Sequence, residues 1–82
     1  MTTTEKRLLW HLRYGPHEES WFTEVTRFSP RWIEDSLECL GNKRYTFRIR
    51  TNGRKEWALT AKGYRASQFW DREGKPCPQR SL

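Results

Sequence analysis

Residues 44–57, RYTFRIRTNGRKEW, decide how the second half of this chain folds. Apolar and basic residues alternate on both sides of Asn52-Gly53. Alternation with a period of two is typical of β-strands, and Asn-Gly between two such runs is the strongest short signal for a hairpin. We therefore predict an antiparallel hairpin that turns at these two residues.

The side chains favour one pairing register of this hairpin. A two-residue loop would put the apolar residues of the two strands on opposite faces. A three-residue loop over residues 51–53, with Gly53 left-handed, would place Arg48 opposite Glu56 and turn both outward with Arg50. Because a slip of one residue moves every side chain to the other face, we predict the three-residue loop. In this register Tyr45 would lie opposite Leu59, and Phe47 would lie opposite Trp57. All four apolar side chains would then face the core.

The N-terminal residues predict a first helix over residues 4–14. Thr2 and Glu5 have the spacing of a capping box, and Gly15 followed by a proline is a typical helix end. Apolar residues recur on one face of this segment, as expected of a helix that packs on a core.

Two further helices are predicted before the hairpin. Ser20 is a candidate N-cap for a short helix over residues 21–27. Ser29 followed by Pro30 is the clearest helix start in the chain and predicts a helix over residues 30–40. Only a few residues separate the two helices, which is the spacing of a helix-turn-helix.

The C-terminal part predicts one more helix and a tail. Thr60 is a candidate N-cap for a helix over residues 61–70. Residues 71–82 contain almost no apolar side chain and include two prolines, so we predict a flexible tail. The expected organisation is therefore one domain over residues 1–70 followed by this tail.

Composition limits the kinds of protein that this chain can be. Eighty-two residues suit a single domain, and no apolar run approaches the roughly 20 residues that cross a bilayer. The two cysteines, Cys39 and Cys77, make a poor disulfide framework, so we expect a cytoplasmic protein without membrane contact. Residues 1–41 carry five basic and seven acidic residues, whereas residues 42–82 carry eleven and three. This asymmetry indicates that the second half contacts a polyanion.

The order of these elements resembles a winged helix-turn-helix domain of the α+β class. Residues 29–45, SPRWIEDSLECLGNKRY, and residues 51–66, TNGRKEWALTAKGYRA, carry the resemblance. MarR-type regulators and related small bacterial and phage regulators have a similar recognition helix, a basic wing, and Leu-Thr-x-x-Gly at the next helix. The resemblance implies a transcription regulator that binds double-stranded DNA, with the third helix in the major groove and the hairpin as the wing.

The resemblance also implies which residues contact DNA. The exposed face of the third helix carries one Arg but three acids, Glu34, Asp35 and Glu38, and such a face is repelled by phosphates. We therefore expect the wing to be the main contact, through Lys43, Arg44, Arg48, Arg50, Arg54 and Lys55. The expected base contacts are Arg31, Trp32 and Glu34, since a carboxylate can accept from cytosine N4.

Other functions stay open at this point. The acidic face of the third helix, flanked by Trp32, could instead dock a basic protein partner, as in a phage inhibitor or adaptor. RNA binding and a homodimer are further alternatives, and a basic hairpin could simply resist aggregation. The sequence contains no phosphate loop, nucleophile motif or paired metal-ligand spacing, so we expect no enzyme activity, metal or cofactor. His11 is expected to be a packing residue.

Overall fold

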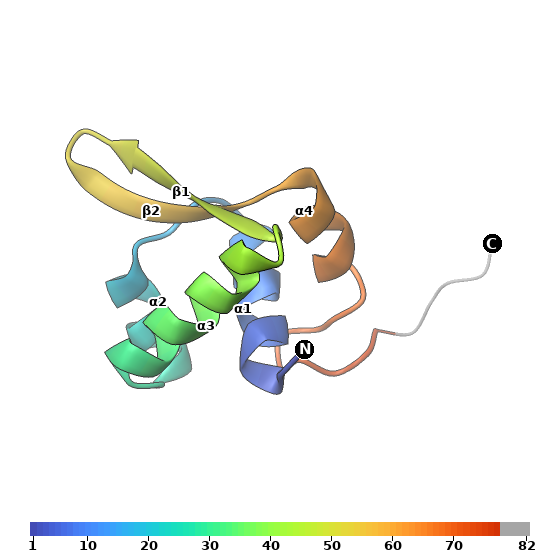
Figure 1. Cartoon of the computed structure of the whole chain (residues 1–82). Helices are drawn as coiled ribbons and strands as arrows, with labels where there is room; N and C mark the ends of the chain where they lie inside the picture. Colours follow the sequence, from blue (N-terminus) through green and yellow to red (C-terminus); the bar gives the residue numbers. More distant parts are fainter. Residues whose placement is uncertain (78–82) are drawn as a thin grey trace.

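The computed structural model describes residues 1–77 and contains four helices and one two-stranded sheet. The elements in chain order are α1 (Thr3–Leu12), α2 (Glu19–Thr26), α3 (Pro30–Asn42), β1 (Thr46–Thr51), β2 (Arg54–Leu59) and α4 (Ala61–Ser67). The two strands form an antiparallel hairpin that lies over the helices, and its turn projects beyond them (Figure 1). The predicted winged helix-turn-helix fold is confirmed.

Local capping explains where three of the helices begin. Thr2 and Glu5 form the predicted capping box, with the Thr2 amide donating to Glu5 Oε1 over 2.8 Å. Ser29 Oγ accepts from the Trp32 amide, and Thr60 Oγ1 accepts from the Gly63 amide. Each side-chain oxygen satisfies a backbone donor that the first helical turn leaves without a partner.

The second helix does not use its predicted cap. It begins at Glu19, its N-cap is Glu18, and no side chain caps it, so the prediction that Ser20 caps this helix is wrong. The chain enters α2 directly from His17, whose backbone exchanges two hydrogen bonds with Trp57. This tertiary pairing fixes the entry of the chain into α2 without a side-chain cap.

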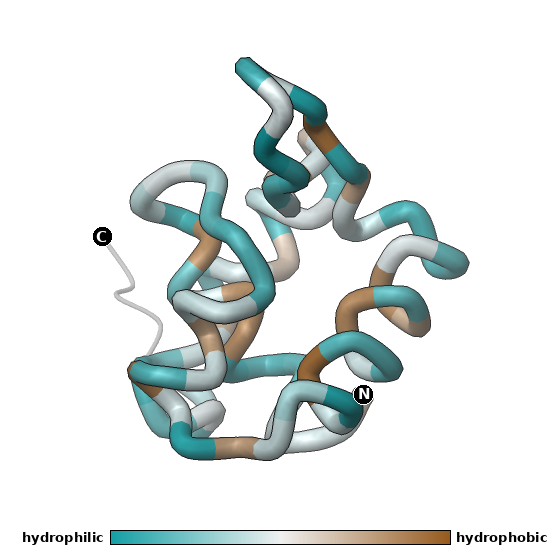
Figure 2. Tube along the Cα trace, turned by 90° about the vertical axis from the view of Figure 1, so that its left-hand side faces the viewer, coloured by the Kyte–Doolittle hydropathy of each residue, from teal (hydrophilic) through white to brown (hydrophobic). Residues whose placement is uncertain are grey.

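The core lies where α1, α2 and α3 meet the inner face of the hairpin. Its buried residues are Leu8, Leu9, Leu12, Phe22, Ile33, Leu37, Leu40 and Trp57. Tyr45 and Leu59 pack against this cluster while partly exposed. By contrast, hydrophilic residues occupy most of the projecting hairpin (Figure 2).

The register of the hairpin differs from the predicted one. Arg48 pairs with Trp57 and Phe47 pairs with Ala58, so the loop has two residues and the predicted three-residue loop is wrong. Asn52 and Gly53 have φ angles of 50° and 78°, as a two-residue hairpin turn with two positive φ values requires. Phe47 is 45% exposed and does not face the core.

The backbone before β1 explains why the argument from alternation failed. Arg44 has a φ of 66°, and the Tyr45 amide donates to the carbonyl of Leu40. Tyr45 therefore packs on the core from a turn that precedes the strand, outside the alternating pattern of β1. Trp57 also reaches the core, but from β2. The rings of Tyr45 and Trp57 therefore do not need to lie on the same face of the sheet.

The C-terminal part packs back on the domain. Gly63 of α4 lies so close to the turn before β1 that an added Cβ would be 2.8 Å from the carbonyl carbon of Tyr45. The helix ends at Ser67, three residues earlier than predicted.

The predicted tail begins with a hydrogen-bonded turn. Asp71 accepts from the amides of Glu73 and Lys75, and Trp70 pairs with Pro76. Residues 78–82, the rest of the predicted tail, lie outside the described residues. The division into a domain of residues 1–70 and a flexible tail stays a prediction. Within residues 1–77, no helix has the length and apolar character needed to cross a membrane.

Candidate nucleic-acid interface

The outer half of the hairpin carries three exposed basic residues, Arg50, Arg54 and Lys55. Arg50 lies directly opposite Lys55, and Arg54 follows the turn. Within residues 1–77, none of the three side chains forms an ion pair or a hydrogen bond. In this part of the chain, no carboxylate lies within ion-pair distance of the three side chains. We call these three residues the wing tip.

At the root of the hairpin, Lys43 has an ion-pair partner, whereas Arg44 is bonded within residues 1–77 only through its backbone. Lys43 Nζ lies 3.4 Å from Oε2 of the buried Glu5. Burial alone would raise the pKa of Glu5, but hydrogen bonds from Thr2 and the charge of Lys43 hold this pKa below its usual value. Arg44 is exposed, and its carbonyl accepts from Thr60 Oγ1 over 2.6 Å. The root therefore joins the hairpin to α1 and α4.

Arg48 lies between the wing tip and the root and faces the helices. Its guanidinium donates to Glu38 Oε1 of α3 over 2.9 Å. The same guanidinium lies 4.8 Å from the ring centroid of Trp57, its partner across the strands. The prediction that Arg48 lies opposite Glu56 and faces outward is wrong, because the loop is one residue shorter.

The exposed side of α3 keeps an acidic character. Glu38 is paired with Arg48, so Glu34 and Asp35 are the two acids of α3 that have no ion-pair partner within residues 1–77. Arg31 is exposed at the start of the helix. Trp32 is 49% exposed, and its indole N–H donates to Thr4 Oγ1 of α1 over 2.9 Å. Half of this ring is therefore accessible, while its polar edge is already used.

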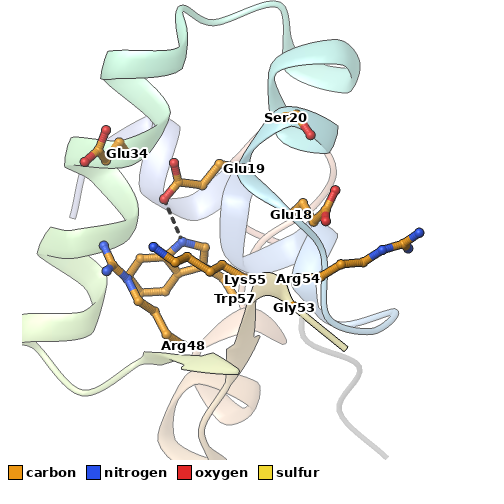
Figure 3. A pocket seen from close by; sticks show the side chains of 9 residues that line it. All are labelled: Glu18, Glu19, Ser20, Glu34, Arg48, Gly53, Arg54, Lys55 and Trp57. Carbon is orange, nitrogen blue, oxygen red and sulfur yellow. Dashed lines mark hydrogen bonds between the residues drawn. The ribbon is translucent and has the colours of Figure 1, made fainter. Parts of the chain in front are cut away.

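A groove separates the hairpin from α2 and α3 and has a volume of about 490 Å³ (Figure 3). Acids line one wall and bases line the other. The lining residues are Glu18, Glu19, Ser20, Glu34, Arg48, Gly53, Arg54, Lys55 and Trp57. The groove brings together Glu34 and three of the basic residues selected from the sequence.

Sequence reasoning missed the role of Glu19 in this groove. Its Oε1 accepts from Trp57 Nε1 over 3.0 Å, as the dashed line in Figure 3 shows. Glu18 and Glu19 precede the predicted second helix over residues 21–27, and adjacent acids between helices are usually solvated. Glu19 and Trp57 are 38 residues apart, and no local pattern in the sequence signals their contact.

A second cavity, of about 400 Å³, lies on another part of the surface and is mainly aromatic. The imidazole of His17 stacks on Trp21 with ring centroids 3.6 Å apart, and His11 packs edge-on against the same indole. Burial, together with the charges of Arg7 and Arg72 and of the nearby His17, lowers the pKa of His11 to about 4. His11 is 8% exposed, which confirms that it is a packing residue.

Neither cysteine forms a disulfide, and the sites of the two thiols differ. Cys39 is exposed on α3. Cys77 is partly exposed after the C-terminal turn. No group of three or more His, Cys, Asp and Glu side chains in the described part of the chain could hold a metal ion.

Comparison with known proteins yields matches among solved structures. No family model and no curated protein matches the chain. Wild-type Lactococcus lactis ZitR in complex with DNA matches with a TM-score of 0.76 at 22% identity, over 90% of this chain and 50% of that one. A cysteine-to-serine mutant of ZitR in complex with DNA has the same TM-score of 0.76 at 23% identity, over 82% of this chain and 48% of that one.

A further match states the class of these neighbours. A crystal structure described as ZitR, a zinc-responsive MarR family member from L. lactis, has a TM-score of 0.76 at 20% identity, over 82% of this chain and 49% of that one. The chain therefore spans about half the length of the solved structures that it matches. These similarities show that its fold is the winged helix-turn-helix of MarR-type regulators.

Proposed function

We propose that this chain binds double-stranded DNA through its basic wing and acts as a small, non-enzymatic transcription regulator. The fold supports the proposal, because two of the similar structures are complexes of ZitR with DNA. The observation that carries it is the wing tip, where Arg50, Arg54 and Lys55 are exposed without acidic partners in the described residues. Cations of this kind bind phosphates and release counterions from DNA.

The balance of charge favours the wing over α3 as the main contact. Two unit charges 4 Å apart interact by about 1 kcal/mol in water and about 4 kcal/mol near a protein surface. Glu34 and Asp35 would therefore offset much of the gain if α3 lay deep in the major groove against phosphates. A shallow approach would leave Arg31 and Trp32 within reach of base edges, with Glu34 as an acceptor for cytosine.

The proposed phosphate contacts follow from exposure and pairing. Arg50, Arg54 and Lys55 are ready to bind without breaking an internal ion pair, and Arg44 is exposed at the root of the same hairpin. Lys43 would first have to leave Glu5. Four phosphate contacts would make the logarithm of the binding constant fall with the logarithm of salt concentration at a slope of about −3.6.

Salt-dependent titration of a generic duplex tests this proposal. Fluorescence anisotropy at several salt concentrations should give that slope for the wild type. The triple variant Arg50→Ala, Arg54→Ala, Lys55→Ala should bind weakly, with a slope of about −0.9 because about one contact remains.

A matched variant controls for total charge. A second triple variant removes the same number of positive charges outside the hairpin: Arg27→Ala, Arg65→Ala, Arg72→Ala. It should keep a slope close to that of the wild type. Absence of binding at low salt, or equal slopes for the wing-tip triple variant and the wild type, would refute binding through the wing.

The alternative function is capture of a basic protein partner by α3. Glu34 and Asp35, next to the half-exposed ring of Trp32, are the observation in its favour. Reversing the charges, with Glu34→Lys and Asp35→Lys, distinguishes the two functions. DNA binding should become stronger if α3 lies near phosphates, whereas capture of a basic partner should be lost.

A further inference from the structure

Arg48 differs from the other arginines of the hairpin in being held on two sides. Its guanidinium donates to Glu38 of α3 over 2.9 Å and lies 4.8 Å from the ring centroid of Trp57. Arg50, two residues further along the same strand and on the same face, has no such contact in the described residues. Two neighbouring arginines of one strand therefore have different surroundings.

Trp57, the second neighbour of Arg48, is itself fixed from several directions. It is 5% exposed, and its indole N–H donates to Glu19 of α2 over 3.0 Å. Its backbone exchanges two hydrogen bonds with His17, of 3.1 and 2.8 Å. Arg48 therefore lies over a buried, hydrogen-bonded ring and reaches from it to α3. Figure 3 shows Arg48 beside Trp57, with Glu19 on the other side of the indole.

These contacts form a continuous chain between two helices, and three of its members, Arg48, Trp57 and Glu19, line the groove. It runs from Glu38 of α3 through Arg48 and Trp57 to Glu19 of α2. The other polar tie between α3 and β1 is at the root, where Thr46 Oγ1 donates to the carbonyl of Leu37 over 3.2 Å. Arg48 therefore supplies the outermost tie that connects the hairpin to α3 within residues 1–77.

The geometry of the hairpin makes this tie important for the wing tip. Asn52 lies four positions after Arg48, which corresponds to roughly 13 Å along the strand. A tilt of about 10° at Arg48 would move the turn by roughly 2 Å over this length of strand. Such a displacement is large on the scale of a hydrogen bond to a phosphate oxygen.

We propose that Arg48 is a positioning residue, which sets the angle of the wing by bridging Glu38 and Trp57, and that it does not bind phosphate itself. The part of this inference that concerns DNA rests on the proposed function. The part that concerns the orientation of the wing is a property of the free protein. The two parts can therefore be tested separately.

The orientation of the wing is measured first, without DNA. Residual dipolar couplings of backbone amides report the orientation of residues 50–55 relative to α1 and α3. Arg48→Ala and Glu38→Ala should each change the couplings of the wing while leaving those of the helices intact. Arg50→Ala, the matched control on the same face of β1, should leave both sets unchanged. Arg48→Lys keeps the charge without the planar fork and should give a partial change.

The effect on DNA is measured next, as a salt titration of the same variants. Arg48→Ala should weaken binding about three- to tenfold at a fixed salt concentration, because the wing must be ordered on binding, and should leave the salt slope unchanged. Arg50→Ala should reduce the magnitude of the slope by about 0.9, since a phosphate contact is lost.

Each result decides one part of the inference. Unchanged wing couplings in Arg48→Ala would overturn the positioning role, whether or not DNA binds. A slope reduced by about 0.9 in Arg48→Ala would identify Arg48 as a phosphate contact and would also overturn it. If the wild type does not bind DNA, the proposed function fails, while the couplings still decide the role of Arg48.

Discussion

Replacing Gly63 by Ala should have two opposing effects on stability. Alanine favours the helical conformation of α4, but there is no space for the added methyl group. Gly63 lies inside the helix, so helix propensity alone predicts that Ala would stabilise the protein by about 1 kcal/mol. The added Cβ, however, would overlap the carbonyl oxygen of Tyr45 and lie 3.1 Å from Cδ2 of Leu59. The oxygen belongs to the backbone of the turn before β1, so it cannot rotate away as a side chain would.

The magnitude of the effect follows from what must move. To accept the methyl group, α4 has to separate from the turn before β1, which weakens the 3.1 Å hydrogen bond from the Thr60 amide to the Tyr45 carbonyl. Overpacking of this kind costs about 1–3 kcal/mol, and a lost hydrogen bond costs about 1 kcal/mol. After subtraction of the gain in helix propensity, we expect a loss of about 2 kcal/mol, or roughly 8–16 °C in Tm.

Urea denaturation followed by far-UV circular dichroism measures this loss. Gly41→Ala in α3 is the matched control, because its Cβ would meet Cζ3 of Trp57 at 3.5 Å, an ordinary contact distance. This control should gain about 0.5–1 kcal/mol from helix propensity. Equal stabilisation by the two substitutions would refute the close approach of α4 to the turn before β1.

Three further predictions concern stability. Since the pKa of His11 is about 4 in the folded protein and near 6.5 when unfolded, its neutral form contributes stability above pH 6.5 that is lost as the pH falls towards 4. Urea denaturation at several pH values should show a steeper loss for the wild type than for His11→Gln. Ser29→Ala should lower the free energy of unfolding by about 1 kcal/mol through loss of the cap on α3, and an unchanged urea midpoint would contradict this. Gly53→Ala should cost about 1 kcal/mol, because Gly53 has a φ of 78° although its surroundings are open; a neutral result in thermal unfolding would count against the observed turn.

Features that depend on a few neighbouring residues could be predicted from the sequence. The capping box of Thr2 and Glu5 and the caps at Ser29 and Thr60 each involve residues three positions apart, and the structure has all of them. The order of helices and the hairpin follows from the same local signals. The start of α2 was missed because it depends on the pairing of His17 with Trp57, 40 positions along the chain.

The register of the hairpin could not be predicted, because the argument assumed that all four apolar residues reach the core from paired strands. The left-handed backbone at Arg44 breaks that assumption by placing Tyr45 on the core before β1 begins. A basic residue with a positive φ at this position carries no signal in the sequence. Intrinsic turn chemistry at Asn52-Gly53 then decides the register.

The candidate interface likewise combines features that are local in the sequence with features that depend on residues far apart in the chain. The density of positive charge around the turn is local, so the wing tip could be identified from the sequence. Which cations have internal partners is a tertiary property: Lys43 reaches Glu5 across 38 positions, and Arg48 reaches Glu38 across ten. These pairs narrow the proposed contact from the six basic residues of the sequence prediction to the wing tip and Arg44.

A map of backbone amide chemical shifts during titration with duplex DNA tests the role of the wing most directly. We expect the largest changes at residues 49–56, with smaller changes near Arg31 at the start of α3. The changes should disappear as the salt concentration rises, because the contacts are mainly electrostatic. Changes confined to α3 or to the aromatic cavity, with the amides of the hairpin unaffected, would contradict the proposal that the wing is the main contact with DNA.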